Sequence, residues 1–339
     1  MKAVRLHGPR EFRIDDVPEP EPGPGEVKIA VRSVGVCASD VHYYLHGQIG
    51  ALEVRRPFIL GHEFAGVVEA VGPGVQGLRP GQLVTSEPVR PCGNCDCCLR
   101  GDYNLCRSLL FFGTPPADGC LCERVVCLGE FSFPLPQGIS LDEGAMTEPL
   151  AVGIEAAAAA QIRGGERCVV LGAGAIGLSA LQAAKAAGAG VVFVSEPIPE
   201  RRKLAEELGA DAAVPPESIE DTVTAAGVDV VVEAAGSPEA PQEAVKLARP
   251  GGTVVLVGIP DDDRITFRAS TARRKALTIR FVRRYRHRFR QALDMVADGR
   301  VKVSPYVTHL FSAKDTALAF ELTAARSGGV VRAVVRFVP

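Results

Sequence analysis

From about residue 165 onward, short apolar segments alternate with helical segments, and this alternation restricts the fold more than any other feature of the sequence. The apolar segments CVVLGAG, VVFVSE, VDVVVEAAG and GGTVVLVGI are nearly continuous, which is typical of strands covered on both faces. The segments between them have the length and spacing of helices. We therefore expect a doubly wound parallel sheet with helices on its faces, over residues 151–283.

A glycine-rich turn follows the first of these strands and begins a helix in the pattern G-x-G-x-x-G; its glycines are Gly172, Gly174 and Gly177. In this context the glycines allow a tight turn and close approach of a pyrophosphate, and the helix N-terminus offers unpaired N–H groups. Glu196 ends the second strand, where a carboxylate binds the ribose hydroxyls and repels a 2′-phosphate, so NAD is favoured over NADP. Two arginines follow closely and weaken that preference. FAD, or a glycine turn without a ligand, is the alternative.

Residues 25–135 have a different pattern, in which short alternating or apolar runs are separated by Gly and Pro. We expect a β-rich, barrel-like domain over residues 1–150. After Arg284 the alternation of strands and helices fades. The segment HRFRQALDMVADG predicts one amphipathic helix, and VVRAVVRFVP predicts a strand that rejoins the first domain, so residues 284–339 are assigned to that domain.

Five of the ten cysteines lie within fifteen residues, a density that favours metal binding in a reducing compartment. The spacing Cys92-x2-Cys95-x2-Cys98-x7-Cys106 offers four thiolates to one tetrahedral Zn²⁺, a closed and therefore structural site in a lobe at about residues 90–110. Cys97 is left out because the even spacing favours Cys98. An iron–sulfur cluster is the rival metal interpretation, and a loop of metal-free thiols is the other.

A second set of metal-ligating types lies in the β-rich domain. GVCASDVHYY contains Cys37, GHEFAG contains His62 and Glu63, and TEPLAVG contains Glu148. Each residue alone is ordinary, because a single buried cysteine is usually a core residue. Together with a dinucleotide fold, one thiolate, one imidazole and carboxylates predict a mixed zinc site that keeps one position for substrate.

The charge balance excludes several function classes. With 38 basic and 40 acidic residues the net charge is −2, so no general basic field is present to bind nucleic acid, despite the arginine-rich stretch FVRRYRHRFRQ. The chain contains no run of eighteen apolar residues, and MKAVRLHGPREF lacks the apolar region of a secretory signal. We expect a cytoplasmic protein with a small-molecule partner and neither a nucleic acid nor a membrane partner.

Taken together, these motifs resemble those of the zinc-dependent medium-chain dehydrogenases, and within them the sorbitol (L-iditol) and xylitol dehydrogenase group. HYYLHGQIG and FFGTPPADG are the segments most specific to the polyol group, and the motifs keep the family's order over nearly the whole chain. The resemblance implies a GroES-like β-barrel catalytic domain joined to a Rossmann domain, one catalytic and one structural Zn²⁺ per subunit, NAD, and a homotetramer. VVLVGI is the candidate segment for pairing between subunits at a sheet edge.

The resemblance also implies residue roles. The catalytic zinc ligands would be Cys37, His62, Glu63 and Glu148, the last directly or through a water. The residues that move the proton of the alcohol would be Ser39, His42 and Glu148. The polyol contacts would be Tyr43, Phe112, Glu148, Arg284 and Tyr285. The NAD contacts beyond the glycine turn would be Ile176, Glu196, Arg201, Val257, Ile259 and Val282. Arg283 departs from the aromatic residue usual in the group, and Ala38 from the usual glycine.

The implied reaction transfers a hydride from a secondary hydroxyl of sorbitol, xylitol or L-iditol to NAD, with Zn²⁺ as Lewis acid. L-threonine 3-dehydrogenase, butanediol dehydrogenase and a dehydrogenase of simple alcohols are the alternatives within the family. Arg284, Tyr285 and Glu148 suit a polyhydroxylated chain better than an apolar alcohol. A non-catalytic protein that binds zinc and NAD is a further alternative, against which the complete set of metal-ligating residues argues. The preferred polyol and the direction of reaction stay open.

Overall fold

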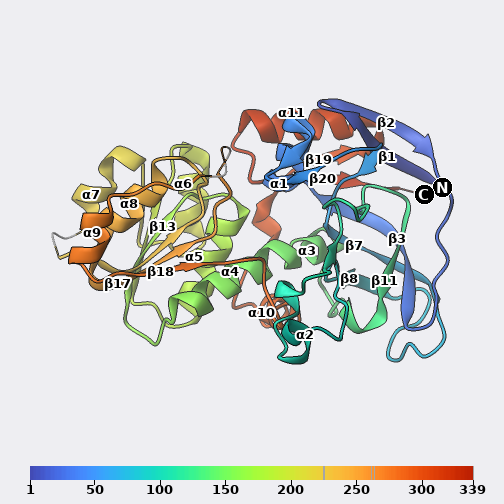
Figure 1. Cartoon of the computed structure of the whole chain (residues 1–339), viewed down its shortest axis with the longest axis horizontal. Coiled ribbons are helices and arrows are strands. Elements are labelled where there is room, and N and C mark those ends of the chain that lie inside the picture. Colours follow the sequence, from blue (N-terminus) through green and yellow to red (C-terminus); the bar gives the residue numbers. More distant parts are fainter. Residues whose placement is uncertain (224–225, 261, 263, 339) are drawn as a thin grey trace. The chain divides into compact units, whose positions relative to one another are not determined.

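Two units make up the computed structural model, which describes residues 1–223, 226–260, 262 and 264–338 (Figure 1). The first unit comprises Met1–Glu148, Phe289–Ala297 and Val303–Pro339, and the second comprises Pro149–Arg288 and Asp298–Lys302. The chain leaves the first unit within helix α4 (Thr147–Ala160) and re-enters it at helix α10 (Phe289–Ala297). Within the described residues, no helix is both long enough and apolar enough to cross a bilayer.

The second unit is built on a parallel sheet, as the sequence predicts. Its described strands follow the order β15-β14-β13-β16-β17-β18, which is the doubly wound order of dinucleotide-binding folds. The strands are β13 (Arg167–Leu171), β14 (Val191–Ser195), β15 (Ala212–Val214), β16 (Val228–Glu233), β17 (Ala248–Leu256) and β18 (Thr278–Phe281). The helices are α5 (Ala175–Ala186), α6 (Pro199–Glu207), α7 (Ile219–Thr222), α8 (Ala240–Leu247) and α9 (Ala269–Arg274).

Valines supply most of the buried surface of this sheet. Val169, Val231 and Val254, on three neighbouring strands, are fully buried, and helix α8 packs Ala244 against the same core. β-branched residues suit strands that are covered on both faces, which explains why these segments are apolar without alternation. The expectation that VVLVGI lies at a sheet edge is wrong, because β17 lies between β16 and β18 and the edge strands are β15 and β18.

The first unit is mainly antiparallel. Its large sheet has the order β12-β8-β7-β3-β20-β19, with β11 also paired to β3, and a smaller sheet has the order β2-β1-β6. The large-sheet strands are β3 (Glu26–Gly35), β7 (Glu63–Val71), β8 (Leu83–Ser86), β11 (Arg124–Leu128), β12 (Ser132–Pro134), β19 (Val307–Ser312) and β20 (Arg332–Arg336). The remaining strands are β1 (Lys2–Gly8), β2 (Glu11–Asp16), β4 (Gln48–Ile49), β5 (Leu52–Glu53), β6 (Phe58–Ile59), β9 (Val89–Arg90) and β10 (Leu110–Phe111). The remaining helices are α1 (Ala38–His46), α2 (Asp96–Leu99), α3 (Leu141–Ala145) and α11 (Thr316–Ala325).

Strand β20 belongs to the large sheet of the first unit. It runs antiparallel to β3 and parallel to β19, so strands from both ends of the sequence form one sheet. Figure 1 shows the two ends of the chain near each other, and Lys2 and Val338 line the same cavity of about 410 Å³.

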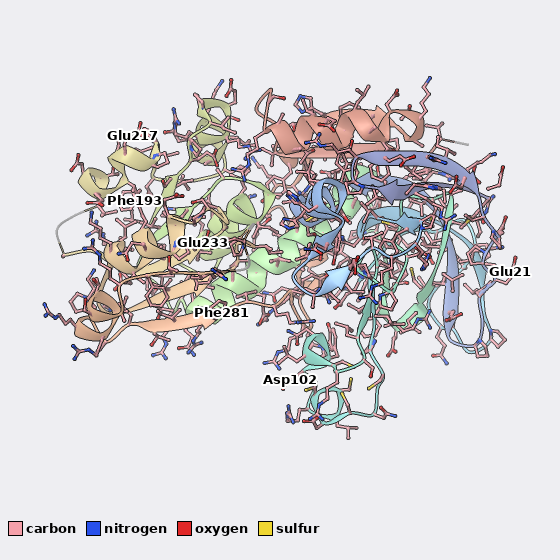
Figure 2. The ribbon with its side chains drawn as sticks, turned by 45° about the horizontal axis from the view of Figure 1, so that its top comes forward. Glu21, Asp102, Phe193, Glu217, Glu233 and Phe281 are labelled. Carbon is pink, nitrogen blue, oxygen red and sulfur yellow. The ribbon has the colours of Figure 1, made fainter. Side chains whose placement is uncertain are left out.

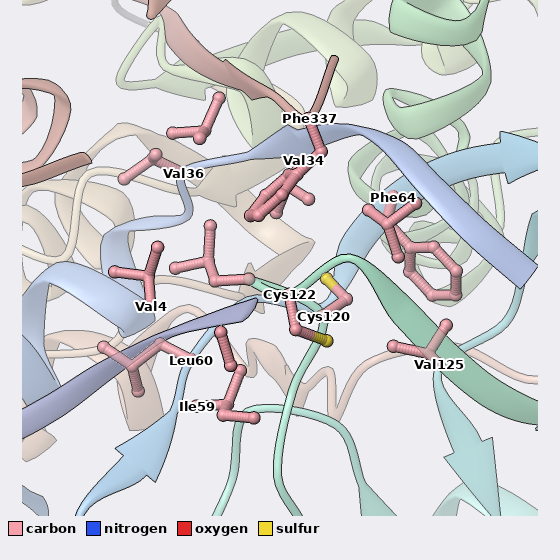
Figure 3. Packing of buried hydrophobic residues seen from close by; sticks show 14 of the residues in the cluster. Val4, Val34, Val36, Ile59, Leu60, Phe64, Cys120, Cys122, Val125 and Phe337 are labelled. Carbon is pink, nitrogen blue, oxygen red and sulfur yellow. The ribbon is translucent and has the colours of Figure 1, made fainter. Parts of the chain in front are cut away.

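The core of the first unit contains cysteines that act as apolar side chains. Cys120 and Cys122 are buried beside Val4, Leu60 and Phe64 (Figure 3). Burial raises the pKa of the Cys122 thiol to about 12, so this sulfur stays protonated and unreactive. These cysteines therefore act as core side chains, unlike the four expected metal ligands in the lobe at about residues 90–110.

The division into units differs from the expected boundaries at three short segments, and the first is residues 149–150, which belong to the second unit. Residues 284–288 belong to the second unit, where Arg288 Nε donates to Glu155 Oε2 at 2.7 Å. Residues 298–302 also belong to the second unit, because the Gln182 side chain donates to the Lys302 carbonyl and accepts from its N–H, both at 2.9 Å. Only after Lys302 does the chain stay in the first unit.

Candidate metal and dinucleotide sites

Cys37, His62 and Glu63 converge in the first unit, with one ligand atom of each within 4.8 Å of the others. Cys37 occupies the N-cap of helix α1. Glu63 is the first residue of β7, and Gly61 turns the chain just before it with φ of 93°. A side chain at Gly61 would be strained and would crowd the Cys120 sulfur. The site is therefore formed by Cys37 at the start of helix α1 and by His62 and Glu63 at the start of strand β7.

Asp40 holds this group together, and sequence reasoning missed it. It is 1% exposed, its Oδ1 lies 3.4 Å from His62 Nδ1, and it accepts the Gly61 N–H at 3.0 Å. Its other oxygen accepts the Cys37 N–H at 3.3 Å. A carboxylate against one imidazole nitrogen fixes the tautomer and leaves the other nitrogen for a metal. Its position three residues after Cys37, typical of a helix cap partner, was the available signal.

Arg332 is a second missed residue and supplies positive charge. It is 4% exposed on β20, its Nη2 lies 3.0 Å from Glu63 Oε1, and its Nη1 donates to the Val36 carbonyl at 3.0 Å. Burial raises the pKa of Glu63, and the Arg332 charge opposes that rise. For His62, burial favours the neutral ring, but the charges of Asp40 and Cys37 outweigh burial and raise its pKa. The cluster therefore carries an excess of negative donors that suits a divalent cation.

An aromatic ring covers the imidazole, and it belongs to Phe111. The Phe111 and His62 ring centres are 5.2 Å apart. Phe112, which we expected among the substrate contacts, instead stacks on Phe64 with centres 6.1 Å apart and packs against the core of the first unit. Phe111 ends β10 and Phe112 lies in the turn that follows, so the two rings have different surroundings. The structure thus places Phe111 beside His62 and Phe112 against Phe64, and Phe112 as a substrate contact stays a prediction.

The other predicted residues of the first unit lie on helix α1 and at the start of helix α4. Ser39, His42 and Tyr43 are on helix α1, where Tyr43 is buried and the His42 ring lies 4.8 Å from that of His46. Glu148 is buried at the start of α4, outside the 4.8 Å group formed among the described residues. Its charge still raises the pKa of Arg332, behind those of Glu63 and Cys37.

The four-cysteine lobe has the geometry of a tetrahedral site. Cys92, Cys95, Cys98 and Cys106 place their sulfurs within 4.8 Å of one another. The Cys92–Cys98 and Cys95–Cys98 sulfur distances are 3.9 and 3.5 Å. Four sulfurs about 2.3 Å from one Zn²⁺ lie about 3.8 Å apart, so the residues present fit the metal. Figure 2 shows sulfur atoms, in yellow, on the lobe that carries Asp102.

Backbone N–H groups aimed at the sulfurs further suit thiolate ligands. The N–H of Cys98 is the main reason that the pKa of Cys95 falls to about 6, and Cys92 N–H donates to Cys106 Sγ at 3.3 Å. Cys97 stays outside the group, and Arg100 Nη2 lies 3.7 Å from its sulfur. The lobe thus excludes the fifth cysteine by the direction of its side chain.

In the second unit the glycine turn joins β13 to α5. Helix α5 begins at Ala175 with Gly174 as its N-cap, and Gly172 has φ of 94°. A Cβ on Gly177 would overlap the Gly172 carbonyl oxygen, so only glycine allows this close return of the chain. Glu196 is 3% exposed and its carboxylate accepts the Ala173 N–H at 2.7 Å, which fixes the turn. A carboxylate has about four acceptor positions, so ribose hydroxyls can still bind.

A buried acid that we did not predict, Glu233, organises the neighbouring loops (Figure 2). It is 1% exposed at the end of β16, and its carboxylate accepts N–H groups of Ala235 at 2.9 Å, Gly236 at 2.7 Å and Gly258 at 3.2 Å. An acid at the carboxyl end of a parallel strand was the available signal.

The remaining predicted cofactor and substrate residues are placed as follows. Val257 N–H donates to the Glu233 carbonyl at 2.9 Å, and Val282 N–H donates to the Leu256 carbonyl at 3.0 Å. Ile259 is exposed, whereas Ile176 and Arg201 are half-buried. Arg284 and Tyr285 follow β18, where Arg284 has φ of 55° and Tyr285 is buried.

Comparison with known proteins agrees along almost the whole chain. Residues 23–137 match the alcohol dehydrogenase GroES-like domain, and residues 175–298 match the zinc-binding dehydrogenase domain. The chain is 37% identical to the sorbitol dehydrogenase of Bacillus subtilis, over 95% of this chain and 93% of that protein. It is 39% identical to the sorbitol dehydrogenase of Homo sapiens, over 93% and 90%. An Escherichia coli oxidoreductase of unknown specificity has a similar structure, with a TM-score of 0.94, 33% identity, and coverage of 100% and 99%.

Proposed function

The chain belongs to the zinc-dependent medium-chain dehydrogenases, and from that premise we propose that it oxidises a secondary hydroxyl of a polyol to a ketone with NAD. Sorbitol, xylitol and L-iditol are the substrates to which this applies. The observation that carries the proposal is the convergence of Cys37, His62 and Glu63 beside a buried guanidinium, in a chain that also contains a dinucleotide turn.

We assign the reacting Zn²⁺ to Cys37, His62 and Glu63, with Glu148 as the further carboxylate, and the structural Zn²⁺ to the four-cysteine lobe. When bound, the reacting Zn²⁺ lowers the pKa of the substrate hydroxyl, and NAD accepts the hydride. Asp40 orients the imidazole of His62 through Nδ1, and Arg332 balances the charge of Glu63. Phe111 covers one face of the imidazole and keeps water from it.

The proton of the alcohol must leave a buried site, and two routes are proposed. Ser39 and His42 lie on successive turns of helix α1, with His42 beside His46 toward the end of that helix. Glu148 offers the second route as a buried carboxylate. Either route would remove the proton of the alcohol by general acid–base catalysis. Tyr43 and Glu148, with Arg284 and Tyr285 of the second unit, are the groups proposed to bind the hydroxyls of the polyol.

On the cofactor side, we propose that the pyrophosphate lies on Gly172, Gly174 and Gly177 at the N-terminus of α5. Glu196 would take the ribose hydroxyls and repel the 2′-phosphate of NADP. The contacts from the surrounding loops would be Ile176, Arg201, Val257, Ile259 and Val282.

Assembly and compartment are also proposals. Strand β18 is an edge of its sheet, and Phe281 on it is 71% exposed. Such an edge can pair with a second copy, and we propose a homotetramer built from such pairs. Light scattering behind size exclusion measures the mass. A cytoplasmic location is proposed because four thiols must stay reduced to bind metal.

The test is the rate of NADH formation at 340 nm with sorbitol, xylitol, ribitol, L-threonine and 2,3-butanediol, before and after chelation and zinc restoration. Zinc-dependent turnover of a polyol supports the proposal. Activity confined to L-threonine or 2,3-butanediol would retain the chemistry and replace the substrate. Absence of NADH formation with every substrate after zinc restoration would contradict the assignment as this enzyme.

A further inference from the structure

Gly35 is a residue of the first unit that lies against the reacting metal group and has no part in the proposed mechanism. It is the last residue of β3 and pairs with Glu63, the first residue of β7, across the sheet. Its backbone does not have the positive φ at which glycine is favoured. The lack of a side chain at this position is therefore a matter of space, and the atoms around that space indicate its role.

The space beside Gly35 is occupied by the carboxylate of Glu63. A Cβ on Gly35 would overlap Glu63 Oε2, and it would lie 2.9 Å from Met146 Cε and 3.2 Å from Glu63 Cβ. Glu63 and Met146 are both fully buried, so neither side chain can turn into solvent to make room. In a close-packed interior even one added methyl group forces its neighbours to move. A side chain at Gly35 would therefore displace the Glu63 carboxylate.

The two oxygens of Glu63 have different surroundings. Oε1 forms an ion pair with Arg332 Nη2 at 3.0 Å. Oε2, which lies over Gly35, is fully buried and has no hydrogen-bond partner among the described residues. A buried carboxylate oxygen without a partner is costly unless something binds it. Because Glu63 belongs to the group formed with Cys37 and His62, Oε2 is the oxygen left for the metal.

Residues 35–37 act on this carboxylate and its surroundings at three successive positions. Gly35 leaves the space for Oε2, the Val36 carbonyl accepts Arg332 Nη1 at 3.0 Å, and Cys37 supplies the thiol of the metal group. The Val36 N–H also donates to the Ala333 carbonyl at 2.9 Å, which ties this segment to the strand that carries Arg332. The arginine that holds Oε1 and the space that holds Oε2 are thus fixed by one short segment.

We propose that Gly35 is a positioning residue: the space left by its missing side chain holds Glu63 Oε2 in the metal group and so selects that oxygen as the metal ligand. The proposal rests on the proposed function, because it takes Glu63 as a ligand of the reacting Zn²⁺. A carboxylate that is bound at one oxygen and has room for the other in one place only has a single orientation. Groups that fix the orientation of a ligand strengthen metal binding without touching the metal.

The test measures the affinity of the reacting group for Zn²⁺ in Gly35→Ala, by competition with a chelator. We expect a loss of about 10–100-fold, the range typical of groups that orient metal ligands, while the four-cysteine lobe keeps its Zn²⁺. Gly8→Ala is the matched control. Gly8 also ends a strand of the first unit without a positive φ, and a Cβ there would meet only Glu11 Oε2, at an ordinary 3.6 Å. This variant should bind Zn²⁺ as the unchanged protein does.

A second readout reports on the geometry of the ligands. With Co²⁺ in place of the reacting Zn²⁺, the visible d–d absorption depends on which ligands surround the metal and at what angles. Gly35→Ala should change this spectrum, because Glu63 Oε2 is displaced. A merely structural role for Gly35 would lower the unfolding midpoint of the metal-free protein and leave the spectrum of the folded protein unchanged.

Glu63→Asp tests whether the two residues act through the same contact. It withdraws the carboxylate by one methylene group and keeps the negative charge beside Arg332. Once Oε2 no longer lies over Gly35, adding Gly35→Ala to Glu63→Asp should weaken Zn²⁺ binding less than twofold further. Losses in directly contacting residues are non-additive in this way, whereas independent effects multiply.

The outcomes separate this proposal from the proposed function. If the unchanged protein binds two Zn²⁺ but oxidises no polyol, the proposed function fails, and the metal measurements still decide the role of Gly35. If the unchanged protein binds Zn²⁺ only in the lobe, both proposals are wrong. The role of Gly35 is refuted if Gly35→Ala binds Zn²⁺ as Gly8→Ala does, if its Co²⁺ spectrum is unchanged, or if the two losses multiply. Should Gly35→Ala fail to fold, adding Glu63→Asp must restore folding, and a double variant that stays unfolded also refutes the proposal.

Discussion

Replacing Glu233 by glutamine tests how the cofactor loops of the second unit are held. The carboxylate accepts three backbone N–H groups, from Ala235, Gly236 and Gly258. A glutamine keeps one oxygen, which can serve Ala235 and Gly236, and turns an NH₂ toward the N–H of Gly258. The variant therefore loses one hydrogen bond and the negative charge behind the other two.

The magnitude follows from the types of hydrogen bond that are lost. A hydrogen bond to a charged group is worth about 1.5–3 kcal/mol and a neutral one about 0.5–1.5 kcal/mol. Burial raises the pKa of Glu233, because an ionised carboxylate is costly to desolvate. Part of the free energy of its hydrogen bonds therefore offsets this cost. We expect a net loss of about 2 kcal/mol for Glu233→Gln. For a unit of this size that lowers the unfolding midpoint by roughly 4–8 °C.

The assay is calorimetric unfolding together with NADH binding followed by fluorescence. Glu217→Gln is the matched control, because Glu217 is exposed on the same unit (Figure 2). The loops held by Glu233 carry Val257 and Ile259, so NADH affinity should also fall. An unfolding midpoint and NADH affinity that both equal those of Glu217→Gln would refute the reasoning.

Three further predictions concern single groups. Gly177→Ala places a methyl group on the Gly172 carbonyl and should abolish NADH binding, measured by fluorescence, while far-ultraviolet dichroism stays unchanged. Arg332→Leu leaves the Glu63 charge buried without a partner, at about 3–5 kcal/mol, so the metal-free first unit should unfold roughly 6–20 °C lower, and added Glu63→Gln should restore most of this. Burial holds the pKa of Glu87 at about 8, above its usual 4.5, so stability should fall as pH rises between these values, and Glu87→Gln should flatten this part of the midpoint–pH curve.

Features encoded by neighbouring residues were predictable from the sequence. The parallel sheet and its glycine turn follow from continuous apolar runs and G-x-G-x-x-G spacing, and both are present. The four lobe cysteines lie within fifteen residues, so their spacing alone indicates convergence. Such patterns work because the chain between the residues is too short to separate them.

Features that depend on distant parts of the chain were not predictable in this way. Arg332 reaches Glu63 only because β20 pairs with β3, and no local pattern marks an arginine in an apolar strand as a charge partner. Which of the adjacent rings of Phe111 and Phe112 lies beside His62 depends on how the end of β10 packs in the folded unit.

Strand β20 also imposes an order on biosynthesis. It lies between β3 and β19, so the first unit lacks a strand of its main sheet until Arg336 has been translated. At about 5–20 residues per second, the roughly 180 residues between Glu148 and Arg332 take a ribosome about 10–40 s. During that time the Ser33–Gly35 end of β3 has an open edge that could pair with other nascent chains. The second unit, nearly continuous in the chain, can fold in that interval, so chaperone demand should fall mainly on the unit that was begun first.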